Sequence, residues 1–391
     1  MSSAAWTSGQ TSNRSSKILV YCLGAGQDVG RSCVMVQMGD KRILLDCGLH
    51  MGFNDQKKFP DFPKLQKKFN GKPMNEVIDL CLVSHFHLDH IGALPYLTEV
   101  MKYTNPVVMT TPTKALLPYM LEDYSRVIIE TNKESDDKKT YLAYSDEQIK
   151  NCVDKVTTIN LHENLEINGI KVKSYYAGHI LGACMFLIEY DGLRVVYTGD
   201  FNSNADRHLG AAWIDKCRPN VLITESTYAT VVRDSKKSRE RDFLKEVQET
   251  TEEGGKVLIP VFALGRAQEL CVLVETIWKR MNNRIPVYFS SGLIEKVQFF
   301  YKLFVNWTNQ SIKSSFLFSN MFDFKHIQPF NRNLMKSPDP MILFATPGML
   351  HGGTSLQVFT EWCQEEKNCI IIPGYCVAGT LGNKLLKGIK K

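Results

Sequence analysis

His85-Phe86-His87-Leu88-Asp89-His90 places four side chains of types that bind metal ions within six residues. An apolar run at residues 77–83 precedes them and is predicted to be a buried strand, and residues 91–96 are predicted to open a helix. The cluster therefore lies on a strand-to-helix turn. In extended chain the side chains of His85 and His87 point to one side, whereas the turn can direct Asp89 and His90 elsewhere. This geometry favours two adjacent metal ions over one.

The residue types of this cluster indicate hydrolytic chemistry. Imidazole nitrogen and carboxylate oxygen bind zinc at about 2.0–2.2 Å, and a site without cysteine can leave one position open to water. Two metal ions about 3.5–4 Å apart can deprotonate water and neutralise the charge that develops on a phosphodiester. A surface cluster or a pair of structural histidines is the alternative, but three of only 9 histidines fall here.

Composition limits the class of protein. The 391 residues suggest two or three domain equivalents, and 44% hydrophobic with 23% charged residues is ordinary for a globular chain. No apolar run reaches the roughly 18–20 residues that span a bilayer, so we expect no membrane partner. Eleven cysteines without a Cys-x-x-Cys pair favour reduced thiols. The net charge of +6 is compatible with a polyanionic partner.

The pattern along the chain predicts an α/β protein with a change of texture near residue 230. Residues 1–16, rich in Ser, Thr, Gly and Asn, predict a disordered tail and not a signal peptide. Strands then alternate with helices, with hairpin turns at Gly39-Asp40 and Asp191-Gly192. We also expect a helix over residues 113–129 and a charged loop over 131–140.

The second part of the chain predicts a different kind of sheet. A helix over residues 238–252, a buried strand over 256–261 and a helix over 266–281 follow one another. Strands that alternate with helices in this way form sheets that are at least partly parallel.

The His-x-His-x-Asp-His motif after a buried strand resembles the signature of the metallo-β-lactamase fold. Four further motifs occur in the order of its β-CASP nuclease branch, the first before the histidine motif and the others after it. They are Leu45-Asp46-Cys47-Gly48, Ala177-Gly178-His179, Tyr197-Thr198-Gly199-Asp200 and Thr224-Glu225-Ser226-Thr227-Tyr228. Residues 260–269, Pro-Val-Phe-Ala-Leu-Gly-Arg-Ala-Gln-Glu, are typical of its members that process RNA 3′ ends. The resemblance runs from about Lys17 to the last residue.

The resemblance implies an αββα sandwich carrying an inserted β-CASP α/β domain. The implied domains are metallo-β-lactamase over 17–229 and β-CASP over 230–391. It implies further that His85, His87 and His179 hold a first zinc ion, that Asp89 and His90 hold a second, and that Asp200 bridges the two.

Other residues match supporting positions of the family. Asp46 is similar to the carboxylate that orients the site, and Glu225 to the acid that assists a catalytic histidine, so Asp46, Asp89 and Glu225 are the candidates for catalytic roles. Two residues are candidates for substrate binding. Arg266 starts a predicted helix, where its guanidinium and the helix amides could meet a phosphate, and His208 follows Asp206-Arg207 near the expected cleft.

The chain departs from the family pattern in one respect. The pattern calls for two further histidines after the β-CASP insertion, one to protonate the leaving oxygen and one to complete the second zinc site. The last histidine of this sequence is His351, within the insertion. We therefore expect this chain to lack both histidines, the last strands of the first domain and the C-terminal region that pairs with partners, and to cleave RNA poorly by itself.

The function implied is a zinc-dependent endonuclease that cuts 3′ ends of nascent transcripts, among them snRNA and other RNA polymerase II transcripts. Residues 46–55 and 211–219 resemble endonucleases of this kind more than those that cut pre-mRNA before polyadenylation. The expected partners are RNA, a paralogous β-CASP scaffold subunit and other subunits of one complex, with the nucleus, and additionally the cytoplasm, as the location. A pre-mRNA 3′-end endonuclease, a non-catalytic β-CASP scaffold and a DNA-repair nuclease of the same branch stay open as alternatives. A single-domain hydrolase of thioesters or lactams would not need the long insertion.

Overall fold

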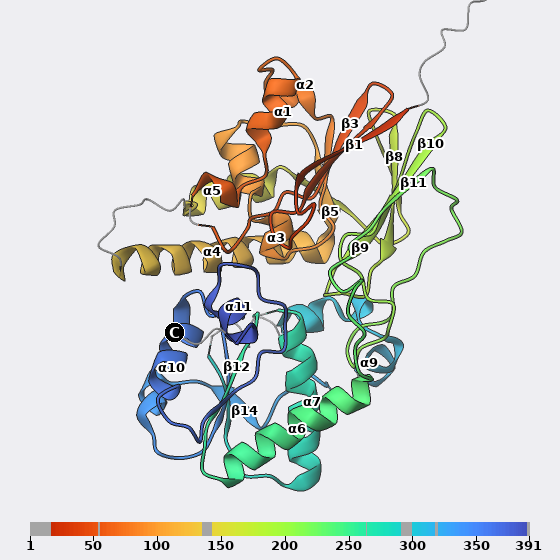
Figure 1. Ribbon diagram of the computed structural model, residues 1–391. Coiled ribbons are helices and arrows are strands. Elements are labelled where there is room, and N and C mark those ends of the chain that lie inside the picture. Colours follow the sequence, from red (N-terminus) through yellow and green to blue (C-terminus); the bar gives the residue numbers. More distant parts are fainter. Residues whose placement is uncertain are drawn as a thin grey trace, which may run out of the picture.

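The computed structural model describes residues 17–53, 55–134, 143–262, 264–290, 299–316 and 320–388. Within these ranges the chain forms two packed sheets and a third sheet with its own helices (Figure 1). The tail predicted over residues 1–16 lies outside the described residues.

The first sheet has six strands whose spatial order follows the sequence. They are β1 (Ile18–Gly24), β2 (Cys33–Met38), β3 (Lys41–Leu45), β4 (Leu80–Leu82), β5 (Val107–Thr110) and β6 (Val156–Ile159). The predicted hairpin turn at Gly39-Asp40 joins β2 and β3 and is confirmed. The strand predicted over residues 77–83 is shorter than expected, because α2 (Met74–Val77) occupies its beginning.

Helices cover the outer face of this sheet. They are α1 (Phe62–Lys68), α2, α4 (Thr111–Glu134) and α5 (Asp146–Asp154), with a short 3-10 turn at Gln56–Lys58. Leu44 and Val107 of the sheet share one buried cluster with Phe62 and Leu116 of the helices. The predicted helix over 113–129 continues to Glu134, so the charged loop predicted over 131–140 is wrong for its first four residues. Residues 135–140 of that loop lie outside the described part of the chain.

The second sheet packs face to face against the first. Its order is β11-β10-β9-β8-β7, from β7 (Asn164–Ile167), β8 (Ile170–Tyr176), β9 (Cys184–Tyr190), β10 (Leu193–Tyr197) and β11 (Val221–Ile223). Ile43 and Leu82 from the first sheet and Phe186 and Val195 from the second lie in one fully buried cluster. The predicted sandwich is therefore confirmed, with a core made by the inward-facing residues of both sheets.

The third sheet is parallel throughout its described strands, as the texture after residue 230 predicts. Its order is β14-β13-β15-β12-β16, from β12 (Val257–Pro260), β13 (Val287–Phe289), β14 (Ile327–Pro329), β15 (Ile342–Ala345) and β16 (Cys369–Ile370). The remaining helices of this part are α6 (Lys236–Glu252), α7 (Arg266–Met281), α9 (Gln310–Ser315), α10 (Gly353–Trp362) and α11 (Leu381–Leu386), with 3-10 turns at Val305–Trp307 and Arg332–Lys336.

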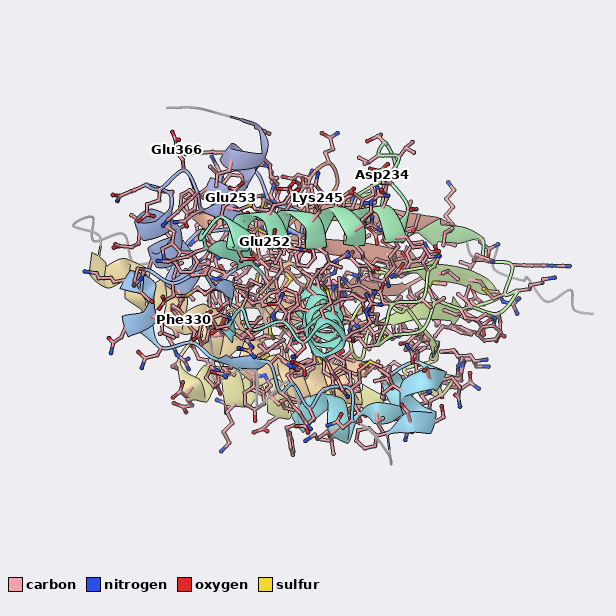
Figure 2. The ribbon with its side chains drawn as sticks, turned by 90° about the horizontal axis from the view of Figure 1, so that it is seen from below. Asp234, Lys245, Glu252, Glu253, Phe330 and Glu366 are labelled. Atoms are coloured by element: carbon pink, nitrogen blue, oxygen red, sulfur yellow. The ribbon has the colours of Figure 1, made fainter. Side chains whose placement is uncertain are left out.

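Helices lie on both faces of the third sheet. α6 and α7 contribute Val247 and Val274 to the buried cluster of one face, and α10 contributes Val358 to that of the other. The helix predicted over 266–281 is confirmed, and the one predicted over 238–252 begins two residues earlier, because the Ser235 side chain accepts a hydrogen bond from the amide of Ser238. The outward side of α6 carries charged side chains such as Lys245 and Glu252 (Figure 2).

The sandwich and the third sheet lie on opposite sides of α4 in Figure 1. The sandwich with its helices is here called the first body, and the third sheet with its helices the second body. Helix α4 packs on the first sheet and contacts α10 of the second body. No helix among the described residues is long and apolar enough to cross a membrane.

Candidate metal centre

The histidine motif lies between the end of β4 and a short helix. His85 and His87 follow β4, and α3 (Leu88–Ile91) carries Asp89 and His90. The predicted strand-to-helix turn is confirmed, but the helix begins at Leu88, earlier than residue 91, and a separate five-residue π-helix spans Tyr96–Val100. Side chains of α3 can therefore face the same space as the histidines that precede it.

Two further motifs reach this place from the second sheet. His179 follows β8 and Asp200 follows β10. His87 Nδ1 lies 3.0 Å from His85 Nε2 and 3.2 Å from His179 Nε2. Asp200 Oδ2 lies 3.7 Å from His179 Nε2 and 4.0 Å from His85 Nε2.

These four ligand atoms all lie within 4.8 Å of one another. Atoms bound tetrahedrally to one zinc ion at about 2.0–2.1 Å would be roughly 3.3 Å apart. The donor set is also one that zinc accepts, since it offers three imidazole nitrogens and a carboxylate oxygen. The four residues therefore fit a metal ion.

Asp89 and His90 adjoin this set through Asp200. His90 Nε2 lies 3.6 Å from Asp89 Oδ2 and 3.5 Å from Asp200 Oδ1. Asp200 thus turns one oxygen toward the three-histidine set and the other toward His90. A bridging carboxylate between two ions needs this arrangement.

Burial favours the neutral form of three of the histidines. Loss of solvent, followed by repulsion from His90, holds the pKa of His85 well below its usual value. Burial likewise lowers the pKa of His87, and it lowers the pKa of His179 to about 3 although Asp200 opposes the change. A neutral imidazole keeps the lone pair that a metal ion requires, so these shifts favour metal binding.

The neighbours of these histidines are negatively charged. Burial opposes ionisation of Asp200, but the charge and hydrogen bond of His90 outweigh it and lower the pKa of that carboxyl. Burial also opposes protonation of His90, yet Asp200, Asp89 and Asp46 together raise the pKa of His90 well above its usual value. The same three carboxylates would attract a cation.

Asp46 lies behind the cluster, fully buried. Its Oδ2 accepts hydrogen bonds from His90 Nδ1 at 2.7 Å, from Ser84 Oγ at 2.8 Å and from the Tyr197 hydroxyl at 2.5 Å. Its Oδ1 accepts from the amide of Ser84 at 2.7 Å. Ser84 Oγ also lies 3.0 Å from His85 Nδ1. Asp46 and Ser84 therefore orient two histidines through the ring nitrogens that face away from the cluster.

The sequence predicted no role for Ser84 or Tyr197. Ser84 directly precedes the histidine motif and Tyr197 opens the motif that ends at Asp200, and only their contacts with Asp46 give them a role. A serine directly before the first histidine was the available signal.

Glu225 and Arg266 also lie near the cluster. Glu225 Oε1 accepts a hydrogen bond from the amide of Phe201 at 3.1 Å, and burial and then the charge of Asp200 raise the pKa of Glu225. Arg266 is exposed at the first residue of α7, and its charge contributes to the low pKa of His179. A Cβ added to Gly265 would lie 3.5 Å from His87 Nε2, so α7 begins directly against the histidine cluster.

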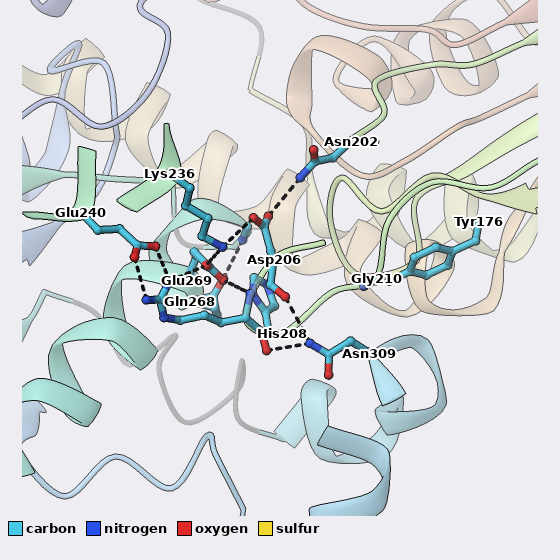
Figure 3. A network of polar contacts seen from close by, with 12 residues as sticks. Tyr176, Asn202, Asp206, His208, Gly210, Lys236, Glu240, Gln268, Glu269 and Asn309 are labelled. Atoms are coloured by element: carbon cyan, nitrogen blue, oxygen red, sulfur yellow. Dashed lines mark hydrogen bonds and ion pairs between the residues drawn. The ribbon is translucent and has the colours of Figure 1, made fainter. Parts of the chain in front are cut away.

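His208 lies elsewhere, within a buried network of polar contacts (Figure 3). Its side chain is 2% exposed, and its Nδ1 lies 3.0 Å from Glu269 Oε2. Glu269 also accepts hydrogen bonds from the amide of Arg207 at 2.8 Å and from Lys236 Nζ at 2.7 Å. The expectation that His208 binds substrate is therefore not supported, because the side chain is enclosed in the joint between the two bodies.

Comparison with known proteins agrees with this architecture. Residues 35–229 match the Metallo-beta-lactamase superfamily domain, and residues 267–385 match the Beta-Casp domain. The chain is 56% identical to Integrator complex subunit 11 of Danio rerio, over 96% of this chain and 61% of that protein. It is 56% identical to the Integrator complex subunit 11 homolog of Dictyostelium discoideum, over 94% of this chain and 49% of that protein.

Another relative is more distant. The chain is 39% identical to Cleavage and polyadenylation specificity factor 73 of Drosophila melanogaster, over 93% of this chain and 52% of that protein. The chain thus spans between about half and three fifths of the length of these relatives.

Proposed function

Because this chain belongs to the metallo-beta-lactamase family whose members carry a Beta-Casp domain, we propose that it is a zinc-dependent RNA endonuclease of the Integrator subunit 11 type. Its substrates are nascent transcripts, including snRNA and other RNA polymerase II transcripts, cut to a 3′ hydroxyl and a 5′ phosphate. The observation that carries the proposal is the convergence of His85, His87, His179 and Asp200, with ligand atoms within 4.8 Å. The higher identity to Integrator subunits than to the polyadenylation factor favours this type.

Each ligand has a part in the proposal. His85, His87, His179 and Asp200 would hold a first zinc ion, and Asp89, His90 and Asp200 a second. When bound, two zinc ions supply a deprotonated water and neutralise phosphate charge. Asp46 keeps a hydrogen atom on His90 Nδ1, so that His90 Nε2 is left to face the cluster.

Two residues would act on the substrate. Arg266 offers a guanidinium beside His179, where it can pair with a phosphate oxygen. Glu225, whose pKa is raised by burial and by Asp200, retains a proton more readily than an exposed glutamate does. This supports a role for Glu225 in moving a proton toward the leaving oxygen.

The partners and location follow from the relatives. We propose that the chain works with a paralogous β-CASP scaffold subunit and other Integrator subunits, in the nucleus and additionally in the cytoplasm. We also propose the division into a tail over 1–16, a metallo-β-lactamase domain over 17–229 and a β-CASP domain over 230–391.

The test measures metal content and cleavage together. The purified chain and its His87→Ala and Asp200→Ala variants are loaded with zinc, analysed for bound metal and assayed on a single-stranded RNA. We expect His87→Ala to weaken binding of the first ion, and Asp200→Ala to weaken binding of both, because Asp200 faces both sets. The weak RNA cleavage expected of this chain should disappear in each variant, while Arg266→Ala should weaken RNA binding with zinc content unchanged. Cleavage that survives the loss of Asp200 would overturn the proposal.

A further inference from the structure

An open groove of about 480 Å³ has Arg266 in its lining. One wall is formed by the chain that connects β11 to α6, and the other by the segment that follows β16. Arg266 belongs to the groove and directly follows Gly265, where an added Cβ would lie 3.5 Å from His87 Nε2. The groove and the histidine cluster are therefore neighbours.

The groove carries positive charge without matching acids. Arg233, Arg239 and Arg266 line it and are all exposed. Among the described residues, the arginines that form ion pairs are Arg194, Arg207 and Arg241, and none of these lines the groove. Asp234 is the one acidic residue in the lining. The Arg239 Nε donates to the carbonyl oxygen of Asp234 at 3.1 Å, but none of the three guanidinium groups forms an ion pair within the described part of the chain. Three such groups around one hollow favour an anion from outside the chain.

The groove also exposes aromatic rings. Tyr228 is 38% and Tyr375 is 40% exposed, one on each wall. The Arg233 guanidinium carbon lies 3.3 Å from the centre of the Tyr228 ring, so charge and ring share one surface. Alternation of cationic and aromatic side chains is typical of surfaces that bind single-stranded nucleic acid, because phosphates meet the charges and unpaired bases stack on the rings.

We propose that this groove binds the single-stranded RNA next to the scissile phosphate. Arg233 and Arg239 contact its phosphates, and Tyr228 and Tyr375 stack with its bases. The proposal rests on the proposed endonuclease function, and it assigns to the segments at 228–239 and 373–376 a part in holding RNA in register with the metal centre. An acidic peptide could also pair with the arginines, but its carboxylates would not stack on the two exposed aromatic rings beside them.

The experiment measures RNA binding as a function of salt. A fluorescently labelled RNA of about 16 nucleotides is compared with one of about 4 nucleotides, which span the range of sites in single-strand binders. The variants are Arg233→Gln/Arg239→Gln and Tyr375→Ala. The matched control is Arg280→Gln/Arg284→Gln, which removes the same charge from exposed positions at the far end of α7.

We expect distinct changes from the two groove variants. For the long RNA, the slope of the logarithm of the binding constant against the logarithm of the salt concentration should become shallower by about 1.4 in the double arginine variant. Each lost phosphate contact on a single strand removes about 0.7 from this slope. Tyr375→Ala should weaken binding of the long RNA by about 5-fold or more with the salt dependence unchanged. The groove variants should bind the short RNA as tightly as the unaltered chain does. The control variant should bind both RNAs as tightly as the unaltered chain does.

Two outcomes separate the proposals. If the unaltered chain binds and cuts RNA but the groove variants match the control, the groove inference is wrong and the endonuclease function stands. If the unaltered chain neither binds nor cuts RNA, the proposed function fails and the groove inference fails with it. Equal competition by polyglutamate and RNA at the groove would also overturn the inference, because it would mark a site for acidic protein.

Discussion

Asp46 concentrates four hydrogen bonds on one buried carboxylate, and these bonds set the directions of His90 and Ser84. The backbone of Asp46 has a φ of +58°, an uncommon conformation for a residue other than glycine. A residue held in this way by its surroundings has little freedom to turn, so the imidazole it orients stays in place.

Replacement of Asp46 by Asn tests this role. The side-chain NH₂ of asparagine would replace one carboxylate oxygen of Asp46 that now accepts hydrogen bonds from His90 or Ser84. That donor would then lose its acceptor. We expect zinc affinity to fall by about 10- to 100-fold, measured by competition with a coloured chelator. Asp215→Asn, which alters an acid paired with Lys173 on the second sheet, is the control and should bind zinc normally. Unchanged affinity in Asp46→Asn would remove the assigned role.

The candidate ligands and the supporting carboxylate of Asp46 were accessible from the sequence, whereas the supporting roles of Ser84 and Tyr197 were not. His85 to His90 stand together in the chain, and His179 and Asp200 each end a strand in a motif that the family resemblance identifies. Tyr197 gains its role only through a contact with Asp46 that spans 151 residues. Sequence patterns carry no signal for a hydrogen bond over that separation.

At the scale of elements, tight turns decide how closely the ligands approach. Gly178, directly before His179, has a φ of +67°, and an added Cβ would lie 2.5 Å from the carbonyl oxygen of Gly210. The loop after β8 can therefore pass the loop after β10 only with glycine at this place.

Gly178→Ala should weaken both the fold and the site. We expect a loss of about 1–3 kcal/mol in the free energy of unfolding, together with weaker zinc binding because His179 is displaced. Gly192→Ala is the matched control: Gly192 has a φ of +74°, but an added Cβ would meet no atom within 4 Å. Urea unfolding and zinc titration of the two variants separate the cost of backbone conformation from that of the close contact. Equal losses in both would contradict the prediction.

Element boundaries were predicted where local chemistry sets them. α7 begins at Arg266 as expected, since the amide of Gly265 donates a hydrogen bond to Gln268 Oε1 at 2.6 Å. The end of α4 was missed because its last turn is charged and polar, and charge by itself indicated a loop. The early start of α3 was missed because its first turn consists of the ligand residues themselves.

For the whole molecule, the joint between the two bodies depends on the polar network of Figure 3. Arg207 comes from the loop after β10 and pairs with Glu240 of α6 and Glu269 of α7. Asn309 donates to the carbonyl oxygen of Arg207 at 2.7 Å. The loop of the sandwich that carries Arg207 thus contacts α6, α7 and the residue before α9.

This network predicts a dependence of stability on pH. Burial opposes ionisation of Glu269, but hydrogen bonds and charge from His208 and Lys236 outweigh it and lower the pKa of Glu269 to about 2. A lowered carboxyl pKa stabilises the fold above the usual value of 4.5, and that contribution is lost as the pH falls toward 2. It amounts to roughly 3 kcal/mol at neutral pH.

Glu269→Gln should therefore unfold more easily than the unaltered chain at neutral pH, and the difference should shrink as the pH falls below about 4.5. Urea unfolding at stepwise lower pH measures this difference. Glu252→Gln, on the exposed side of α6 (Figure 2), is the control and should show little difference at any pH. A Glu269→Gln difference that does not vary with pH would contradict the assignment.

The order of strands in the three sheets has a consequence for how the chain acquires its structure during synthesis. In the first two sheets each described strand pairs with its neighbour in sequence, and the last of these strands ends at Ile223. In the third, β12 must wait for β15 and then for β16, where Cys369, the partner of Val257, lies 112 residues later (369 minus 257). Short loops close before long ones, since loop closure costs more entropy as the loop lengthens. The paired strands of the first two sheets can therefore form while the rest of the chain is still being made, and the joint at Arg207 closes after them, because its partners Glu240, Glu269 and Asn309 come later in the chain.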